Sequence, residues 1–415
     1  MNSLLPHLAQ VRKSSRSLRK QSDHAKQQLL HRLAELVLAH ESAILAANQL
    51  DLDRMPDTDP KKDRLRLTPE RIQGLVASVR AIADLPDPTG QVHLQRELQP
   101  GLQLQKVSVP LGVVGIIYES RPNVTIDVAA LCLRSGNGVV LRGGSDAEHS
   151  NIALVQIIHQ AMQESGGDSQ ALYLMPTDRA LVQELLTADR YVDILIPRGS
   201  QALIDFVRAN ATVPTIETGA GVCHTYVHAA ADLAKAAAIV VNAKTSRPSV
   251  CNALDTVVVD QAVAKEFLPL IVAGFQQHGV EVFADSESHA IFQELGYPSL
   301  QQAKEADFGR EYLDFKCSVK VVEGPEAALE HIHTFSSRHS EAIVSEDAHL
   351  CERFLAEIDA AAVYANASTR FTDGGEFGLG AEIGISTQKL HARGPFALEK
   401  LVTEKWVVRG NGQVR

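Results

Sequence analysis

Residues 113–144 read VVGIIYESRPNVTIDVAALCLRSGNGVVLRGG. The stretch begins with a continuous apolar run, VVGIIY, passes through a segment with helical spacing of its apolar residues, and ends on a second apolar run, VVLR. Short apolar runs of this kind are typical of strands that are buried on both faces of a parallel sheet. The stretch therefore predicts a strand, a helix and a second strand, the unit from which α/β folds are built.

The same alternation continues on the C-terminal side of this stretch. Helical patterns at 151–162, 178–186 and 200–210 alternate with the apolar runs 171–175 and 191–197. A comparable series begins after Gly221, with strands expected at 224–228, 253–260 and 280–285 and helices at 229–244 and 263–279. The sequence thus predicts an α/β fold with two parallel-sheet domains.

Other elements are expected to lie outside the two sheets. Residues 7–50 show an amphipathic helical pattern, and a further helix is expected at 69–82. Gln99-Pro100-Gly101-Leu102 places Pro and Gly where a type II turn requires them, which predicts a β-hairpin from Val92 to Val109. The alternating tail at 401–415 carries the chain's single Trp, Trp406, and is expected to join the hairpin in a small β arm used for oligomerisation.

Composition narrows the classes of function. A length of 415 residues exceeds the size at which one core stops growing, roughly 250–300 residues. The net charge of -10 and an aromatic content of 5% argue against a nucleic-acid-binding protein or a membrane-surface protein. No apolar run approaches the roughly 18 residues of a membrane span, and the N-terminus lacks the pattern of a signal peptide. A soluble cytoplasmic protein is therefore expected.

Five cysteines without a CxxC pair indicate reduced thiols. Cys251 follows a Pro-containing loop and precedes an apolar strand in NAKTSRPSVCNALDTVVV, and Lys244 and Arg247 beside it would favour the nucleophilic thiolate. The alternative is that Cys251 is simply a small buried residue. Cys223 is the competing nucleophile, but its dipeptide with His224 is weak evidence, since adjacent side chains on a strand point to opposite faces.

Asn123 lies between the first buried strand and the helix that follows it. Its amide, together with the backbone N–H of Cys251, could stabilise the oxyanion that develops during acyl transfer. Asn is also a common helix cap, and the spacing does not separate the two roles.

Nucleotide binding is suggested by two turns rather than by the usual G-x-G-x-x-G fingerprint, which is absent. In LRGGSDAEHSN and ILIPRGSQALI a strand runs into glycine and then into a helix, with an arginine beside the glycine. Such turns can bind phosphate, although many strand–glycine–helix turns only connect the two elements and bind nothing. The candidate residues are Arg142, Gly143, Gly144, Arg198 and Gly199.

Metal binding is not expected. The sixteen histidines include HIHTFSSRH, yet neither HExxH nor a paired Cys/His spacing occurs.

Several long motifs, taken together, resemble the γ-glutamyl phosphate reductases, a family within the aldehyde dehydrogenase superfamily. The resemblance covers nearly the whole chain, and RPSVCN and STRFTDGG with FGLGAE are specific to that family. The motifs are VPLGVVGIIYESRPNVTIDVAALCLRSGN, VVLRGGS, ILIPRGS, NAKTSRPSVCNALDTV, VYANASTRFTDGGEFGLGAEIGISTQKLHARGP and EKWVV.

The resemblance implies a domain organisation. It implies a cofactor-binding domain at 1–91 and 110–220, to which 369–397 return, and a catalytic domain at 221–368. Residues 92–109 and 398–415 would form the oligomerisation arm, and a homo-oligomer is expected.

The resemblance also implies a reaction, in which NADPH reduces γ-glutamyl phosphate to glutamate 5-semialdehyde with loss of phosphate, in proline biosynthesis. It places Cys251 as the nucleophile, Asn123 in the oxyanion hole and Glu311 on the nicotinamide ribose. Glu217, in IETGAG, corresponds to the acid that activates water in aldehyde-oxidising relatives, and a reductase has no use for it.

Three arginines in the motif loops, Arg121, Arg247 and Arg370, are the hypothesised anchors for the carboxylate and phosphate of the substrate. Ordinary surface ion pairing is the alternative for each. Two other functions remain open, the oxidation of another small aldehyde and a non-catalytic scaffold. Glutamate 5-kinase, which makes the acyl phosphate, is a hypothetical partner.

Overall fold

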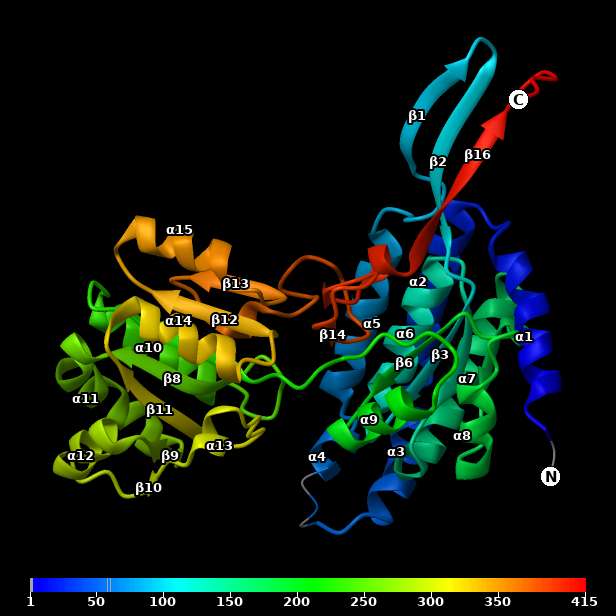
Figure 1. The fold of residues 1–415 in the computed structure, drawn as a ribbon. Helices are drawn as coiled ribbons and strands as arrows, with labels where there is room; N and C mark the ends of the chain where they lie inside the picture. The colour runs from blue at the N-terminus through cyan, green and yellow to red at the C-terminus, as the bar shows by residue number, and fades with distance from the viewer. Residues whose placement is uncertain (1–2, 58, 60) are drawn as a thin grey trace. The chain divides into compact units, whose positions relative to one another are not determined.

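The computed structural model describes residues 3–57, 59 and 61–415, which form two compact units (Figure 1). The first unit comprises the chain up to Thr218 together with Gly378–Gly384 and Pro395–Arg415. The second comprises Gly219–Phe377 and Ile385–Gly394. Within the described residues, no helix combines the length and the hydropathy that a membrane crossing requires.

The stretch 113–144 forms the centre of the first unit. It folds into β3 (Val113–Tyr118), α6 (Pro122–Arg134) and β4 (Gly138–Arg142), as predicted. With β5 (Leu172–Leu174) and β6 (Ile194–Arg198) these strands make a parallel sheet in the order β5-β4-β3-β6. β3 is buried along its whole length, which explains why its sequence is apolar without alternation.

Helices cover both faces of this sheet. The helical pattern expected at 7–50 is confirmed and is divided among three helices. Ser22 caps the second by accepting a hydrogen bond from the Ala25 backbone, and His40 ends that helix and begins the next. The helices of this unit are α1 (Leu5–Leu18), α2 (Asp23–Ala39), α3 (Glu41–Asp53), α4 (Lys61–Leu65), α5 (Pro69–Asp84), α6, α7 (Glu148–Glu164), α8 (Arg179–Leu186) and α9 (Gln201–Asn210).

The second unit contains a parallel sheet in the order β10-β9-β11-β8-β7-β12-β13. The two-sided burial that the sequence predicts is clearest at β8, where Val257 packs in one hydrophobic cluster and the neighbouring Val258 packs in another. Its strands are β7 (Cys223–Val227), β8 (Leu254–Asp260), β9 (Glu281–Ala284), β10 (Leu300–Gln302), β11 (Lys316–Val322), β12 (Ser340–Val344) and β13 (Ala362–Ala365).

Two sets of helices produce these clusters. The cluster around Val257 draws residues from α10 (Leu233–Thr245), α11 (Gln261–Gln277) and α12 (Ser286–Glu294). The cluster around Val258 draws residues from α14 (Gly324–Phe335) and α15 (Ala348–Glu357). A short helix, α13 (Glu305–Phe308), precedes β11. The sheet is therefore covered on both faces, as expected for an α/β domain.

A three-stranded antiparallel sheet extends from the first unit (Figure 1). β1 (Val92–Gln99) and β2 (Leu102–Pro110) form the predicted hairpin, with Gly101 at a φ of 77° in the turn, a conformation that favours glycine. The tail strand β16 (Val402–Arg409) pairs with β2 from Val402 opposite Pro110 to Arg409 opposite Gln103. The expected association of tail and hairpin is therefore present.

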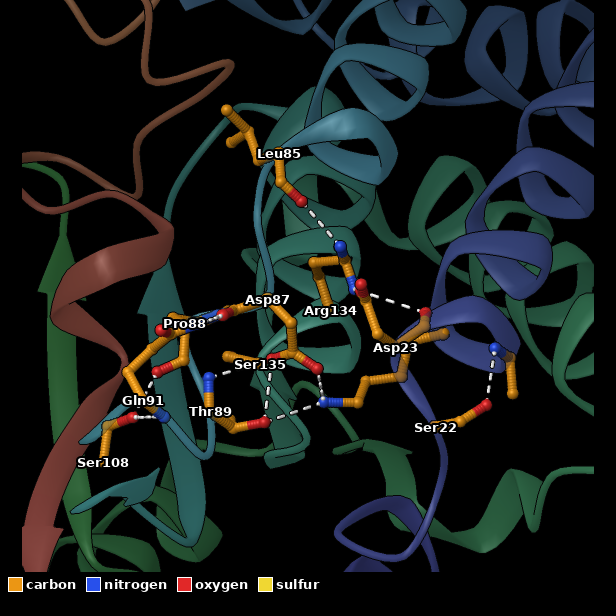
Figure 2. A network of polar contacts seen from close by, with 12 residues as sticks. Ser22, Asp23, Leu85, Asp87, Pro88, Thr89, Gln91, Ser108, Arg134 and Ser135 are labelled. Atoms are coloured by element: carbon orange, nitrogen blue, oxygen red, sulfur yellow. Dashed lines mark hydrogen bonds and ion pairs between the residues drawn. The ribbon is translucent and has the colours of Figure 1, made fainter.

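The base of this sheet is fixed by a polar network (Figure 2). The buried Lys26 of α2 donates to Asp87 at 2.5 Å and to Thr89 at 3.1 Å. Ser108 of β2 accepts a hydrogen bond from the Gln91 backbone at 2.9 Å. These contacts attach the hairpin and the segment before it to the helices of the unit.

The segment expected to return to the first domain, 369–397, is divided between the two units. Only 378–384 and 395–397 lie in the first unit, whereas 369–377 and 385–394 lie in the second. Long-range hydrogen bonds explain the difference at the start of the segment: Thr369 donates to the carbonyl oxygen of Asn252 at 2.8 Å, and the hydroxyls of Thr372 and Ser340 are 2.7 Å apart. Four residues of the expected 1–91 segment, at positions 1, 2, 58 and 60, lie outside the described residues.

Candidate functional site

Cys251 lies in the loop between α10 and β8, at the amino end of the strand. It is half-buried, whereas Cys132, Cys223, Cys317 and Cys351 are buried. Burial raises the pKa of Cys223 well above its ordinary value, so this competing thiol is disfavoured as a thiolate nucleophile. Its Sγ instead donates to the carbonyl oxygen of Cys251 at 3.2 Å.

Gly221 packs directly against the Cys251 loop. A Cβ added at Gly221 would lie 1.6 Å from the carbonyl oxygen of Cys251, so no other residue fits without a shift of backbone. The backbone N–H of Gly221 donates to the Glu311 carboxylate at 2.8 Å. Glu311, predicted from the resemblance to hold a ribose, is thereby joined to the loop of the candidate nucleophile through a single glycine.

Arg370 is held by two residues of the Cys251 loop. Its Nε donates to the hydroxyl of Ser246 at 3.1 Å, and its Nη1 donates to Oδ1 of Asn252. In return, Nδ2 of Asn252 donates to the backbone carbonyls of Arg370 at 3.2 Å and Thr372 at 2.9 Å. Two motifs that are far apart in the sequence, RPSVCN and STRFTDGG, are therefore interlocked at the nucleophile.

Two arginines, Arg370 and Arg247, place positive charge at this loop. Partial burial lowers the pKa of Arg370, and the charge of Arg247 acts in the same direction, so the two guanidinium groups lie close enough to repel one another. An anion bound between or beside them would relieve that repulsion. This arrangement suits a negatively charged substrate.

Lys244 is buried and contacts Lys316 and Asp255. Its ammonium group is fully buried, donates to the carbonyl of Lys316 at 2.7 Å and pairs with Asp255 at 3.6 Å. Burial raises the pKa of Asp255 to about 7, and the charge of Lys244 opposes this shift. Lys244 therefore has a buried partner in Asp255, and its support of the Cys251 thiolate stays a prediction.

The remaining candidate residues gather at the carboxyl ends of three neighbouring strands in the first unit. The loops after β3 and β6 are joined, because Glu119 donates its backbone N–H to the carbonyl of Arg198 at 3.2 Å and accepts from the backbone of Ser200 at 3.0 Å. Sheet order reverses direction between these two strands, which is where ligands bind in open α/β sheets. The residues are Arg121 and Asn123 after β3, Arg142, Gly143 and Gly144 at the end of β4, and Arg198 and Gly199 at the end of β6.

Asn123 is the second residue of α6 and not its cap. The N-cap position is Arg121, and no side chain caps this helix among the described residues. The Asn123 amide instead donates to the Asp127 carboxylate one turn along the helix, at 3.3 Å. Burial raises the pKa of Asp127, while the hydrogen bonds from Asn123 and Ser78 oppose that shift. The capping alternative is therefore wrong, and the amide is oriented by its own helix.

Comparison with known proteins identifies the family. The aldehyde dehydrogenase family model matches residues 7–289. The γ-glutamyl phosphate reductase of Chlorobium chlorochromatii is 53% identical over 416 residues, which is 99% of each chain. The chain belongs to the aldehyde dehydrogenase family, in the branch of the γ-glutamyl phosphate reductases.

Other members of this branch agree. The γ-glutamyl phosphate reductase of Bacteroides fragilis is 50% identical and covers 98% of both chains. The crystal structure of γ-glutamyl phosphate reductase from Thermotoga maritima matches with a TM-score of 0.93 at 44% identity over 100% of both chains. An acetylating aldehyde dehydrogenase from Geobacillus thermoglucosidasius, only 16% identical, shares the fold with a TM-score of 0.73 over 99% of this chain and 97% of that one.

Membership of the aldehyde dehydrogenase family implies a nicotinamide cofactor, and the glycines at the strand ends fit one. A Cβ at Gly143 would lie 2.2 Å from Nδ2 of Asn151, and a Cβ at Gly199 would lie 2.5 Å from the Glu119 carboxylate. The backbone is therefore kept bare at both turns. Packing against Asn151 and Glu119 thus requires glycine at both turns, and these turns lie at the strand ends where nucleotides bind in open α/β sheets.

Buried polar atoms beside these glycines also support nucleotide binding. Arg142 donates to the carbonyl of Thr177 at 3.0 Å, and burial lowers its pKa. Among the described residues, Nε of Arg142, Nε of Arg198 and Oδ1 of Asp146 are buried without a hydrogen-bond partner. Asp146 lies next to Gly144, where a Cβ would be 2.2 Å from that same oxygen. Buried polar atoms of this kind usually have a partner, and a bound nucleotide would supply one.

Glu217 forms an ion pair with Arg208. Nε of Arg208 donates to one carboxylate oxygen of Glu217 at 2.8 Å, and Nη2 donates to the other. This bidentate pairing gives Glu217 a structural partner within the first unit. In the described parts of the chain, no group of three or more His, Cys, Asp or Glu side chains is placed to hold a metal ion.

Three residues of the site were not singled out from the sequence: Gly221, Ser246 and Asn252. Gly221 lies in the ETGAG segment, and Ser246 and Asn252 flank Cys251 in its loop. Their roles arise from contacts with residues distant in sequence, such as the bonds from Asn252 to Arg370 and Thr372. Ser246 and Asn252 lie inside the motif of the candidate nucleophile, whereas Gly221 lies in the segment of Glu217, and no further pattern in the sequence marks these three residues.

Proposed function

We propose that this protein reduces γ-glutamyl phosphate to glutamate 5-semialdehyde and phosphate with NADPH, a step of proline biosynthesis. The observation that carries the proposal is the loop around Cys251, where a half-buried thiol lies in the same hydrogen-bonded motif as Arg370. An acyl phosphate offers both the electrophilic carbon that a thiolate attacks and an anion that a guanidinium binds. The curated relatives named γ-glutamyl phosphate reductase support this substrate.

The chemistry follows from the thiol. The Cys251 thiolate adds to the acyl carbon, the bond from that carbon to the phosphate oxygen breaks, and phosphate leaves with the electron pair. A thioester remains on Cys251. The nicotinamide, when bound, supplies the hydride that reduces this thioester. Collapse of the resulting thiohemiacetal releases the aldehyde and returns the sulfur as thiolate.

Asn123 is our proposed donor to the oxyanion that develops on the acyl oxygen. An amide carries two N–H donors, so the bond to Asp127 orients the group and leaves the other N–H for a ligand. Arg121 and Arg247 are proposed anchors for the substrate's charged groups. Glu311 is the proposed partner of the nicotinamide ribose, and Arg142 and Arg198 are the proposed partners of the cofactor phosphates, including the 2′-phosphate of NADPH.

The reverse assay tests the proposal. Glutamate semialdehyde, inorganic phosphate and NADP are mixed with the enzyme, and NADPH formation is followed at the nicotinamide absorbance. We expect oxidation that requires phosphate and yields the acyl phosphate. Oxidation that proceeds equally without phosphate and yields the free carboxylate would instead assign the protein to the aldehyde oxidisers.

We also propose a cytoplasmic homo-oligomer. The β1-β2-β16 sheet is the surface proposed for association, since Trp406 and Val408 are exposed on it. Glutamate 5-kinase is a proposed partner, because the acyl phosphate it makes is unstable and direct transfer would protect it. Sedimentation of the enzyme with and without the kinase measures both associations.

A further inference from the structure

Asn252 follows the candidate nucleophile directly and is almost completely buried, with 3% of its surface exposed. Its Nδ2 donates to the carbonyl oxygens of Arg370 and Thr372, and its own carbonyl oxygen accepts a hydrogen bond from Thr369. These contacts occupy both the backbone and the side chain of the residue. The function proposed above gives Asn252 no role.

The two carbonyls determine which way the amide faces. An asparagine amide has a donor end and an acceptor end, and only the donor end can face the carbonyls of Arg370 and Thr372. Oδ1 must then face the other way, where it accepts from Nη1 of Arg370. The orientation of the amide is therefore fixed by backbone, and the amide in turn fixes the guanidinium.

Ser246 completes the arrangement from the other side of the loop. Its hydroxyl accepts a hydrogen bond from Nε of Arg370 at 3.1 Å. A guanidinium has five N–H donors in one plane, and the contacts with Ser246 and Asn252 use two of them. The plane of Arg370 is thus set by two residues of the nucleophile loop, and donors remain for a ligand.

Position identifies the ligand group. The guanidinium is hydrogen-bonded to the residue that follows Cys251, and the charge of Cys251 is among the causes that act to raise the pKa of Arg370, so the two groups are neighbours. The anionic group nearest the carbon that Cys251 attacks is the phosphoryl group, whereas the α-carboxylate lies at the far end of the glutamyl chain. A planar donor group suits a phosphoryl group, to which it can donate two parallel hydrogen bonds.

We propose that Asn252 is a positioning residue that holds the Arg370 guanidinium on the phosphoryl group, an assignment that rests on the function proposed above. Asn252 itself does not touch the substrate. Its loss leaves Arg370 in place as a charge but free to rotate away from the leaving group, so phosphate binding weakens while aldehyde binding changes little.

The test compares the two substrates of the reverse reaction in Asn252→Ala. We expect the KM for inorganic phosphate to rise at least about tenfold, the usual value of a hydrogen bond to a charged group. The KM for glutamate semialdehyde should change far less. Asn252→Asp conserves shape but replaces the donor end by a carboxylate oxygen and neutralises Arg370, so it should not restore phosphate binding.

A second readout needs neither cofactor nor turnover. Iodoacetamide alkylates an accessible thiolate, and bound phosphate should slow the alkylation of Cys251. Asn252→Ala should require at least about tenfold more phosphate for the same protection. Ser246→Ala removes the second partner of Arg370 at an exposed position, and should shift both measurements in the same direction by a smaller factor.

Asn48→Ala is the matched control, since Asn48 is equally buried and also bonds backbone on both ends of its amide, at Leu65 and Leu67. It should lower thermal stability without changing the KM for phosphate. The assignment is overturned if both KM values rise in parallel in Asn252→Ala, or if neither phosphate measurement moves. A wild-type enzyme without phosphate-dependent oxidation would overturn the proposed function as well, and is recognised before any variant is made.

Discussion

The carbonyl oxygen of Cys251 is confined from two sides. Cys223 donates to it at 3.2 Å, and Gly221 lies so close that a Cβ would be 1.6 Å away. Because the carbonyl and the thiol belong to the same residue, a shift of this backbone also moves the sulfur. The geometry of the thiol therefore depends on a residue that carries no functional group.

Gly221→Ala should consequently lower the reverse activity at least about a hundredfold, which is the cost of displacing a reacting group by about an ångström. Steady-state rates measure the loss, and thermal unfolding shows that the variant is folded. Gly74→Ala is the control: a Cβ at this exposed position inside α5 meets nothing within 4 Å, and should stabilise the protein by about 0.5–1 kcal/mol. Full activity of Gly221→Ala would show that the loop can shift without consequence.

The two cysteines of this region should differ sharply when replaced by serine. Cys251→Ser should abolish phosphate-dependent oxidation, since a serine hydroxyl in the same position is a far weaker nucleophile. Cys223→Ser should retain most of the activity, because its thiol is buried, its pKa is raised, and a hydroxyl can also donate to the Cys251 carbonyl. Thioester trapping by mass spectrometry identifies the acylated residue. An acyl group on Cys223 would contradict the assignment.

At the residue scale the sequence indicates candidate functional groups but not the contacts that hold them. Cys251 can be proposed from its position in a loop and from the nearby Arg247 in the sequence. The charge of Arg247 lowers the pKa of Arg370. The pair between Lys244 and Asp255 could not be predicted, because Asp255 becomes a neighbour only when β8 is formed. Asn252 and Arg370 are far apart in the chain, and no local pattern reveals a hydrogen bond between them.

At the scale of helices and strands, a buried ion pair between Lys26 and Asp87 joins α2 to the segment that leads into the arm. Lys26 is 3% exposed and its partner Asp87 12%. Burial alone would raise the pKa of Asp87, but hydrogen bonds from Lys26 and Thr89 outweigh it and hold the pKa below its ordinary value. Figure 2 shows Asp87 and Thr89 within the polar network of the segment that leads into β1.

Lys26→Met should destabilise the protein by about 3 kcal/mol, because it leaves the Asp87 carboxylate buried without its partner. Denaturant unfolding followed by circular dichroism measures the change. Lys235→Met makes the same substitution in an exposed pair with Glu346 and should cost under about 1 kcal/mol. Equal losses in the two variants would mean that burial of the pair is unimportant.

The pH dependence of this difference has a defined sign. The pKa of Asp87 is lower in the folded state than in the unfolded state, so the pair stabilises the fold above the unfolded value of about 4. The contribution is lost as the pH falls through the lower, folded value. The gap between wild type and Lys26→Met should therefore be constant near neutrality and shrink in acid below about pH 4.

The local pattern of apolar residues predicts whether a segment is a helix or a strand. It predicts less well where the element begins and which strands lie beside one another. The apolar run at β3, the helix α6 and the strand β4 are read directly from residues 113–144. The break of the N-terminal helix at Ser22 depends on one capping hydrogen bond, which the apolar periodicity does not record. The placement of β11 between β8 and β9 is a long-range choice, and no property of its sequence indicates the neighbours.

At the scale of the whole molecule, the candidate residues of the first unit lie at the carboxyl ends of its strands, whereas those of the second unit lie at the amino ends. The candidate nucleotide residues lie at the carboxyl ends of β3, β4 and β6, as the rule for open α/β sheets predicts. Cys251 and Gly221 lie at the amino ends of β8 and β7 instead. A rule based on strand ends would therefore have located the first set of residues and missed the second, which only the chemistry of the thiol indicated.

The arm presents an edge that suits pairing with another chain. β2 is the central strand of its sheet, so β16 is an edge strand, and Trp406 and Val408 on it are 56% and 54% exposed. Exposed edges with apolar side chains are templates for association. Trp406→Glu should therefore lower the mass of the proposed assembly, measured by sedimentation equilibrium, while each protomer remains folded. Val414→Glu adds the same charge to the same tail beyond the strand and should leave the mass unchanged. An assembly that survives Trp406→Glu would show that the arm is not its interface.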